Sequence, residues 1–280
     1  MRPFKIGVLS DSFRLAPREG LRKSKEVGAS GVQVYACQGE VSPEGMDAAA
    51  RKDFKAFVAG LGLEIAALCG DLGGGFADEE KNPPKVKKSK EIVDLAVDLG
   101  TRVVTTHIGV VPEDRNANAY KTMLAACKEL ADHAAKKGVT FAVETGPEKA
   151  VTLKGFIDAV GSKGIGVNLD PANLVMVVAD DPAQAVHTLG KYIVHTHAKD
   201  GVQLKPGDAE AIYGGAPGID YNQLFKEVPL GQGGVNWDEY LDALEAVGFK
   251  GYLTIEREVG EDPAKDIREA VKFLRKKIGA

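Results

Sequence analysis

The sequence lacks the features of a secreted, membrane-spanning or nucleic-acid-binding protein. Its 280 residues include three widely spaced cysteines and no CxxC pair, so we expect reduced, buried thiols. No apolar run approaches the ~18 residues of a membrane span, and the opening MRPFKIGVLSDS has no signal-peptide pattern. With 36 basic and 40 acidic residues, the net charge of −4 argues against nucleic acid. We therefore expect a cytoplasmic protein with no membrane partner and no nucleic-acid partner.

The sequence also lacks the GxGxxG turn that often follows the first strand of a dinucleotide-binding sheet, because its first strand runs on as GVLSDS. It contains instead eight short runs rich in Val, Ile and Leu, which alternate with helical patterns and start about 35 residues apart, the size of a βα unit. Eight such units predict an α/β protein with a single (β/α)8 TIM-barrel domain over residues 1–280, and a doubly wound sheet is the alternative. The predicted strands are Phe4–Leu9, Gly31–Ala36, Glu64–Cys69, Arg102–His107, Thr140–Glu144, Ile165–Leu169, Tyr192–His197 and Tyr252–Glu256.

Two segments interrupt the regular pattern. The interval between the seventh and eighth predicted strands is longer than the others, and Gly201–Asp220 within it is rich in Gly, Pro and polar residues. We expect a long loop insertion at about 201–220 on the C-terminal face of the barrel, either as a lid or as a surface insertion. The motif GDLGGGF at Gly70–Phe76 predicts a tight turn, with a backbone anion site as the alternative.

Charged side chains and a histidine follow the apolar part of predicted strands five to eight. Glu144, Asp170, His197 and Glu256 each stand at the C-terminal end of a strand, where barrel active sites are built. Because these strands are neighbours around a barrel, we expect the four side chains to converge. Carboxylates brought together in a buried place repel, and a bound cation removes that repulsion. The pattern therefore predicts one divalent metal ion, with Mn²⁺, Mg²⁺ or Co²⁺ favoured and Zn²⁺ or Fe²⁺ as alternatives.

Other polar residues near these strand ends have roles that the sequence leaves open. His195 either supports His197 from a lower layer or is a core histidine. Asp200 is expected to orient His197, and capping of the following turn is the alternative. His107 is expected to contact substrate, and Lys199 either binds a substrate hydroxyl or is a solvated loop lysine.

Four short motifs stand at these strand ends: VETG with Glu144, NLDPAN with Asp170, HAKD with His197 and LTIERE with Glu256. In their order they resemble the motifs of the xylose-isomerase-like superfamily of TIM barrels, which includes sugar and sugar-phosphate isomerases and epimerases, inosose dehydratases and endonuclease IV-type enzymes. The segment PLGQGGVNW at Pro229–Trp237 resembles the Gly-rich segment of these proteins. The resemblance implies that the four strand-end residues bind one divalent metal ion and that the two glutamates also act as the acid/base pair.

The chain departs from two branches of this superfamily. Endonuclease IV-type enzymes carry a histidine three residues after the strand-six Asp, where this chain has Asn173. They also carry an Asp-x-His at the places of Phe225 and Glu227, so a trinuclear zinc site is incomplete here. Ketose 3-epimerases tend to have a histidine at the position of Asn173 as well. We interpret Asn173 as a substrate-binding residue.

The site and the resemblance together predict a divalent-metal-dependent sugar or sugar-phosphate isomerase or epimerase. In this hypothesis the metal polarises a substrate carbonyl, Glu144 or Glu256 removes the adjacent proton, and the enediolate is reprotonated by the other. The alternatives are a dehydratase acting on a polyhydroxy ketone such as an inosose, an endonuclease IV-like metal phosphodiesterase, and a non-catalytic sugar-binding barrel. The expected partner is a small sugar or polyol-derived substrate, and homo-oligomerisation stays open.

Overall fold

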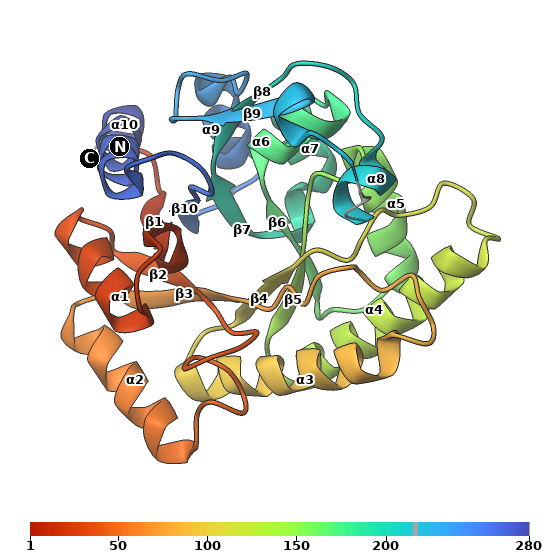
Figure 1. Ribbon diagram of the computed structural model, residues 1–280, viewed down its shortest axis with the longest axis horizontal. Coiled ribbons are helices and arrows are strands. Elements are labelled where there is room, and N and C mark those ends of the chain that lie inside the picture. Colours follow the sequence, from red (N-terminus) through yellow and green to blue (C-terminus); the bar gives the residue numbers. More distant parts are fainter. Residues whose placement is uncertain (215–217, 280) are drawn as a thin grey trace.

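Eight parallel strands close into a barrel in the computed structural model, which describes residues 1–214 and 218–279 (Figure 1). Around the ring they follow the order β1-β10-β7-β6-β5-β4-β3-β2. This closure confirms the predicted (β/α)8 TIM barrel, and the predicted strand ends agree with the observed ones to within one residue. The barrel strands are β1 (Lys5–Leu9), β2 (Gly31–Tyr35), β3 (Glu64–Cys69), β4 (Val103–Thr106), β5 (Thr140–Glu144), β6 (Ile165–Leu169), β7 (Ile193–Ala198) and β10 (Tyr252–Ile255).

Helices surround the barrel and bury one face each against it. Local sequence signals set their ends, because α7 and α10 begin with proline behind the capping side chains of Asp181 and Asp262. Gly100 and Gly138 end α3 and α4 in the left-handed conformation, with φ of 86° and 69°. The outer helices are α1 (Pro17–Glu26), α2 (Ala48–Gly60), α3 (Asn82–Leu99), α4 (Asn118–Lys137), α5 (Ala150–Val160), α7 (Pro182–Leu189), α9 (Trp237–Ala246) and α10 (Pro263–Ile278).

The excursion after β7 has secondary structure of its own. Strands β8 (Asp200–Gln203) and β9 (Phe225–Val228) pair antiparallel as a ribbon outside the barrel, and α8 (Ala209–Gly214) lies between them in sequence. Figure 1 shows this ribbon beside the one-turn helix α6 (Pro171–Asn173). The predicted loop insertion therefore contains short elements over its described part, while residues 215–217 lie outside the described residues.

Apolar side chains hold the excursion against the segment that follows β6. Ile212, Tyr213 and Phe225 pack on a small cluster that includes Met176 and Val177. The same five residues line a cavity at the C-terminal end of the barrel. The excursion thus forms one wall of that cavity.

Asp200 ties the start of the ribbon to the Gly-rich segment that precedes α9. Its carboxylate accepts hydrogen bonds from the backbone N–H groups of Gly201 (2.9 Å), Gly231 (2.8 Å) and Val235 (3.2 Å), and from the Trp237 indole (2.9 Å). The expectation that Asp200 orients His197 does not match these contacts. The chain leaves the barrel direction at β8, so the Asp200 side chain points to the Gly-rich segment instead.

Within residues 1–214 and 218–279, no helix has the length and apolar character needed to cross a membrane.

Replacing Asp200 should destabilise the fold, because three backbone amides and one indole N–H would lose a buried, charged acceptor. We expect Asp200→Ala to lower the free energy of unfolding by about 3 kcal/mol or more. Urea denaturation followed by circular dichroism measures this change. Asp238→Ala is the control, since it removes a surface ion pair with Lys277, and such pairs contribute little to stability. Equal effects of the two substitutions would contradict the anchoring role.

Candidate metal centre and active site

Four side chains predicted to converge do meet at the C-terminal end of the barrel. Glu144 is the last residue of β5, Asp170 follows β6, His197 lies in β7 and Glu256 follows β10. These strands are consecutive around the ring, so their carboxyl ends meet along one arc. All four residues are buried, and one ligand atom from each lies within 4.8 Å of the others.

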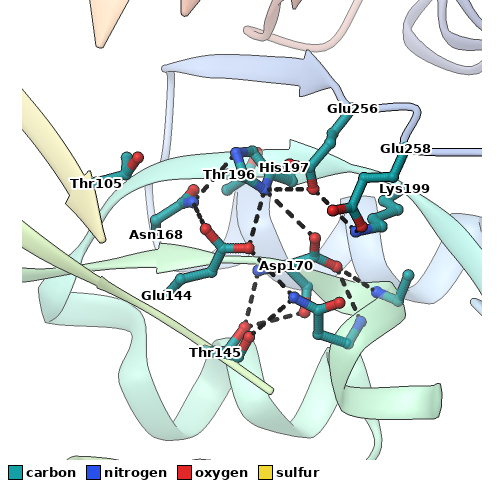
Figure 2. Close-up of polar contacts among 12 residues, drawn as sticks. Thr105, Glu144, Thr145, Asn168, Asp170, Thr196, His197, Lys199, Glu256 and Glu258 are labelled. Atoms are coloured by element: carbon teal, nitrogen blue, oxygen red, sulfur yellow. Dashed lines mark hydrogen bonds and ion pairs between the residues drawn. The ribbon is translucent and has the colours of Figure 1, made fainter. Parts of the chain in front are cut away.

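His197 Nδ1 stands at the centre of the three carboxylates. It lies 3.3 Å from Glu144 Oε1, 3.3 Å from Asp170 Oδ2 and 3.2 Å from Glu256 Oε2. Figure 2 shows the three acids pointing toward the imidazole from different sides. Asp170 uses its other oxygen, Oδ1, to accept the backbone N–H groups of Ala172 and Asn173 at 2.8 and 2.9 Å. Its position is therefore fixed by the first turn after β6.

Two amide side chains, which the sequence analysis did not single out, orient this cluster. His197 Nε2 donates to Gln33 Oε1 at 2.9 Å across the barrel, and Gln33 in turn donates to Thr105 Oγ1 at 2.8 Å. This contact places a ring proton on Nε2, so that Nδ1 is the nitrogen that faces the acids. Asn168 donates to Glu144 Oε2 at 3.0 Å from the middle of the barrel. No local sequence signal marks Gln33 or Asn168, because each acts through strands distant in the chain.

Burial and mutual charge determine the protonation of the cluster. Burial raises the pKa of Glu144, but the neighbouring His197 and His107 outweigh it and lower that pKa. Burial likewise opposes ionisation of Glu256, yet Lys199 and His197 hold its pKa well below the usual range. For His197, burial disfavours the imidazolium, but the surrounding carboxylates raise its pKa well above the ordinary value. The three carboxylates therefore stabilise a positive charge at the position of His197 Nδ1.

A divalent cation can supply this positive charge. Three carboxylate oxygens and one imidazole nitrogen are a donor set suited to hard or borderline divalent ions. A cation bound between them would take the place of the proton that the acids otherwise hold on Nδ1. The buried cluster of Glu144, Asp170, His197 and Glu256 could hold a metal ion, and the identity of that ion stays a prediction.

His107 and Asn173 lie beside Glu144. His107 Nδ1 donates to Asp71 Oδ2 at 3.0 Å, and its Nε2 lies 3.6 Å from Glu144 Oε1 without a hydrogen-bond partner among the described residues. Asn173 Nδ2 donates to Glu144 Oε1 at 3.2 Å. Both residues border the cavity, as a substrate-binding residue would. Their contact with substrate stays a prediction. Asp71, which orients His107, was not predicted and comes from the turn after β3.

Lys199 is buried in a group of acids rather than solvated. Its Nζ lies 3.1 Å from Glu256 Oε2, 4.0 Å from Glu227 Oε2, and in contact with Glu258. Burial opposes its charge, but Glu256, Glu258 and the other acids raise its pKa well above the ordinary value. Lys199 is therefore held charged beside Glu256, which itself is kept ionised.

His195 lies one layer below His197 in the barrel. It is buried, its ring packs edge-on against His197 with centroids 6.0 Å apart, and its Nε2 has no hydrogen-bond partner among the described residues. Burial, together with the charge of His197, lowers the pKa of His195 to about 3. These contacts favour a neutral core histidine over a residue that supports His197 by a hydrogen bond.

A cavity of about 230 Å³ opens over the cluster. Tyr35, Asp71 and His107 border it on one side, and the apolar side chains of the excursion form another wall. A larger groove of about 880 Å³ runs between α3 and α4 on the outside of the barrel. None of the predicted site residues borders that groove, so the smaller cavity is the candidate active site.

A closed parallel barrel with three acids and one histidine converging at its C-terminal end defines a TIM barrel with a candidate divalent-metal centre. The family described as "xylose isomerase-like TIM barrel" matches residues 21–277, and the chain belongs to this family.

Similar proteins support this assignment. A crystal structure of a xylose isomerase domain protein from Planctomyces limnophilus is 29% identical, with a TM-score of 0.81 and coverage of 99% of both chains. An uncharacterized protein of Methanocaldococcus jannaschii is 25% identical over 75% of this chain and 67% of its own. The L-ribulose-5-phosphate 3-epimerase UlaE of Escherichia coli O157:H7 is 24% identical over 73% of this chain and 67% of its own.

Divalent metal should stabilise the folded protein through His197. At a free Mn²⁺ concentration of 100 times Kd, one site of this kind adds about 2.7 kcal/mol to the free energy of unfolding. We expect metal-stripped protein to show a higher Tm after addition of Mn²⁺ and His197→Ala to lose most of that increase. The control is His187→Ala, an exposed histidine on α7, which should keep the full increase. A full increase in His197→Ala would contradict the proposed ligand set.

Glu148 gives a separate, pH-dependent prediction. Burial raises its pKa from 4.5 to about 7, although the Val111 N–H and His107 act in the opposite direction. A carboxyl that holds its proton more tightly when folded stabilises the protein below pH 4.5, and this contribution is lost as pH rises to about 7. Relative to wild type, Glu148→Gln should therefore gain stability between pH 5 and pH 8, by up to about 3 kcal/mol.

Urea denaturation at several pH values measures this difference. Glu113→Gln, an exposed residue in the adjoining segment, is the matched control. A difference between Glu148→Gln and wild type that does not change with pH would show that Glu148 does not titrate in this range.

Proposed function

We propose that the protein is a divalent-metal-dependent sugar isomerase or epimerase in which Glu144 and Glu256 exchange protons with the substrate. The observation that carries this proposal is the position of the two glutamates. They come from β5 and from the end of β10, the outer members of the four-strand arc, and their carboxylates face the same point from opposite sides of His197 (Figure 2). A substrate carbon held between them has a base on one side and an acid on the other.

The metal ligands and the two glutamates have different roles in this reaction. Glu144, Asp170, His197 and Glu256 would hold the ion, which when bound supplies positive charge that acidifies the C–H next to a substrate carbonyl. One glutamate accepts the proton from that carbon, and the other, after taking up a proton from solvent, delivers that proton to the substrate. Delivery to the opposite face of the same carbon gives epimerisation, and delivery to the neighbouring carbon gives aldose–ketose isomerisation.

The neighbouring side chains support these proton transfers. Lys199 and His197 keep Glu256 ionised, so it is ready to accept a proton. Asn168 and Asn173 donate hydrogen bonds to the two oxygens of Glu144 and fix its orientation. His107 Nε2, buried and aimed at the same place, offers a hydrogen bond to a substrate oxygen.

The other predicted functions have less support. Among the described residues, His, Cys, Asp and Glu side chains gather into one group of metal-ligand character, and a phosphodiesterase with three zinc ions needs more ligands than that group holds. A dehydratase or a non-catalytic sugar-binding barrel stays as an outcome of the test below.

The proposal includes the ion, the partner and the location. The expected ion is Mn²⁺, Mg²⁺ or Co²⁺, the expected partner is a small sugar, and the expected location is the cytoplasm.

Removing either glutamate's ability to carry a proton should stop exchange with solvent. We expect Glu144→Gln and Glu256→Gln each to reduce deuterium incorporation from D2O into ketose substrates at least ~100-fold. Proton NMR on the metal-loaded protein measures this incorporation, and metal content is determined in parallel so that loss of chemistry is not confused with loss of the ion. Glu129→Gln, an exposed residue on α4, is the control.

The pattern of results separates the alternatives. Activity retained in both variants would remove the two glutamates from catalysis. Loss of water from a polyhydroxy ketone would indicate the dehydratase. Binding of sugars without exchange in wild-type protein would favour the non-catalytic barrel.

A further inference from the structure

The residues around the candidate active-site cavity carry an excess of negative charge. Asp71, Glu144, Glu256 and Glu258 border it, and Asp170 is buried within the ligand cluster. Against these five carboxylates stand Lys199, His107 and the divalent ion that the cluster would hold. The cavity therefore stays negative even when His107 is protonated.

Lys199 is not free to bind an anion. It is the single lysine, with no arginine beside it, among the described residues that border the cavity. Its Nζ already contacts Glu256, Glu258 and Glu227, and the residue is 3% exposed. A phosphate group would have to displace carboxylates from this lysine, whereas phosphate sites in proteins use uncommitted Arg, Lys or backbone amides.

Several backbone amides near the cavity are also occupied. The N–H groups at the start of α6 donate to Asp170 itself. In the glycine motif after β3, Gly73 N–H donates to Asp71 Oδ1, and Phe76 N–H donates to the Ile108 carbonyl. These contacts favour the turn interpretation of Gly70–Phe76 over an anion site.

A neighbouring cavity is bordered by further acidic side chains. It has a volume of about 730 Å³ and shares Tyr35 and Asp71 with the first cavity. Asp11 and Glu40 border it as well, and Glu40 is paired with Arg18 at 3.1 Å, although no lysine or arginine belongs to its described lining. In the first cavity the side chains of the excursion form an apolar wall. A sugar bound there would therefore meet both acidic and apolar side chains.

We propose that this site takes an uncharged sugar and excludes sugar phosphates. The inference rests on the proposed function for the reaction and on the charge distribution for the selectivity. It separates this chain from its relative UlaE, whose name describes an epimerase of a sugar phosphate. Repulsion between the site and a phosphate dianion acts over a few ångströms in a partly buried cavity, where it is weakly screened.

Matched pairs of substrates test this selectivity. Metal-loaded protein is titrated calorimetrically with free ketopentoses and ketohexoses and with their terminal phosphates, and solvent-deuterium exchange is followed on the same compounds. We expect at least ~10-fold tighter binding of the free sugar. Added salt should improve the affinity for the phosphate only slightly, because charges in a partly buried cavity are weakly screened, and leave that for the free sugar unchanged.

Binding and exchange separate the two proposals. Equal or tighter binding of phosphates overturns the inference, and exchange confined to phosphates overturns it while supporting the isomerase or epimerase function. Tighter binding of a free sugar without exchange supports the inference and contradicts the proposed function. Binding of neither class overturns both.

A charge variant tests the cause. Glu258 borders the cavity, its side chain is 60% exposed, and it contacts Lys199. Glu258→Gln should increase the affinity for phosphates several-fold and change that for free sugars by less than about twofold. Glu261→Gln, an exposed residue three positions further along, should leave the discrimination unchanged. If Glu258→Gln also leaves it unchanged, the selectivity is not electrostatic and the inference is wrong.

Discussion

The structure of the site depends on three carboxylates that are buried around one imidazole nitrogen. Such a group is stable only with positive charge at its centre. The barrel brings the acids there because parallel strands end at one rim, and four consecutive strands, β5, β6, β7 and β10, each deliver one ligand. The protonated His197 meets the charge requirement within the chain, and a divalent ion meets it more fully.

The same requirement explains the ionic contacts around the cluster. Acidic and basic side chains alternate outward from Glu256, through Lys199 to Glu227, and from Glu227 through Arg257 to Asp266 on α10. Each buried charge thus has a partner of opposite sign. Because Glu227 belongs to β9, this sequence of contacts links the ribbon after β7 to the proposed acid/base residue Glu256. The ribbon therefore forms part of the cavity wall and also influences the charge of the site.

The barrel and its converging acids could be predicted from the sequence because both leave local signals in it. Each strand is a short apolar run, and Glu144, Asp170, His197 and Glu256 each stand directly at a strand end. Gln33 and Asp71 carried no such mark, since their partners His197 and His107 lie in other parts of the chain and are reached only after the barrel closes. The ribbon escaped prediction for another reason, because its strands have four residues each and too little alternation to show a period.

The proposed selectivity of the site depends largely on segments that the barrel pattern does not specify. Proton abstraction next to a carbonyl needs the ring of ligands and two carboxylates, which the strand ends provide. The shape and charge of the cavity come also from the excursion, through Tyr213 and Phe225, from Tyr35 at the end of β2 and from Asp71 in the turn after β3. The strand ends can therefore indicate a class of reaction, while the substrate must be deduced from the charge and shape of the loops.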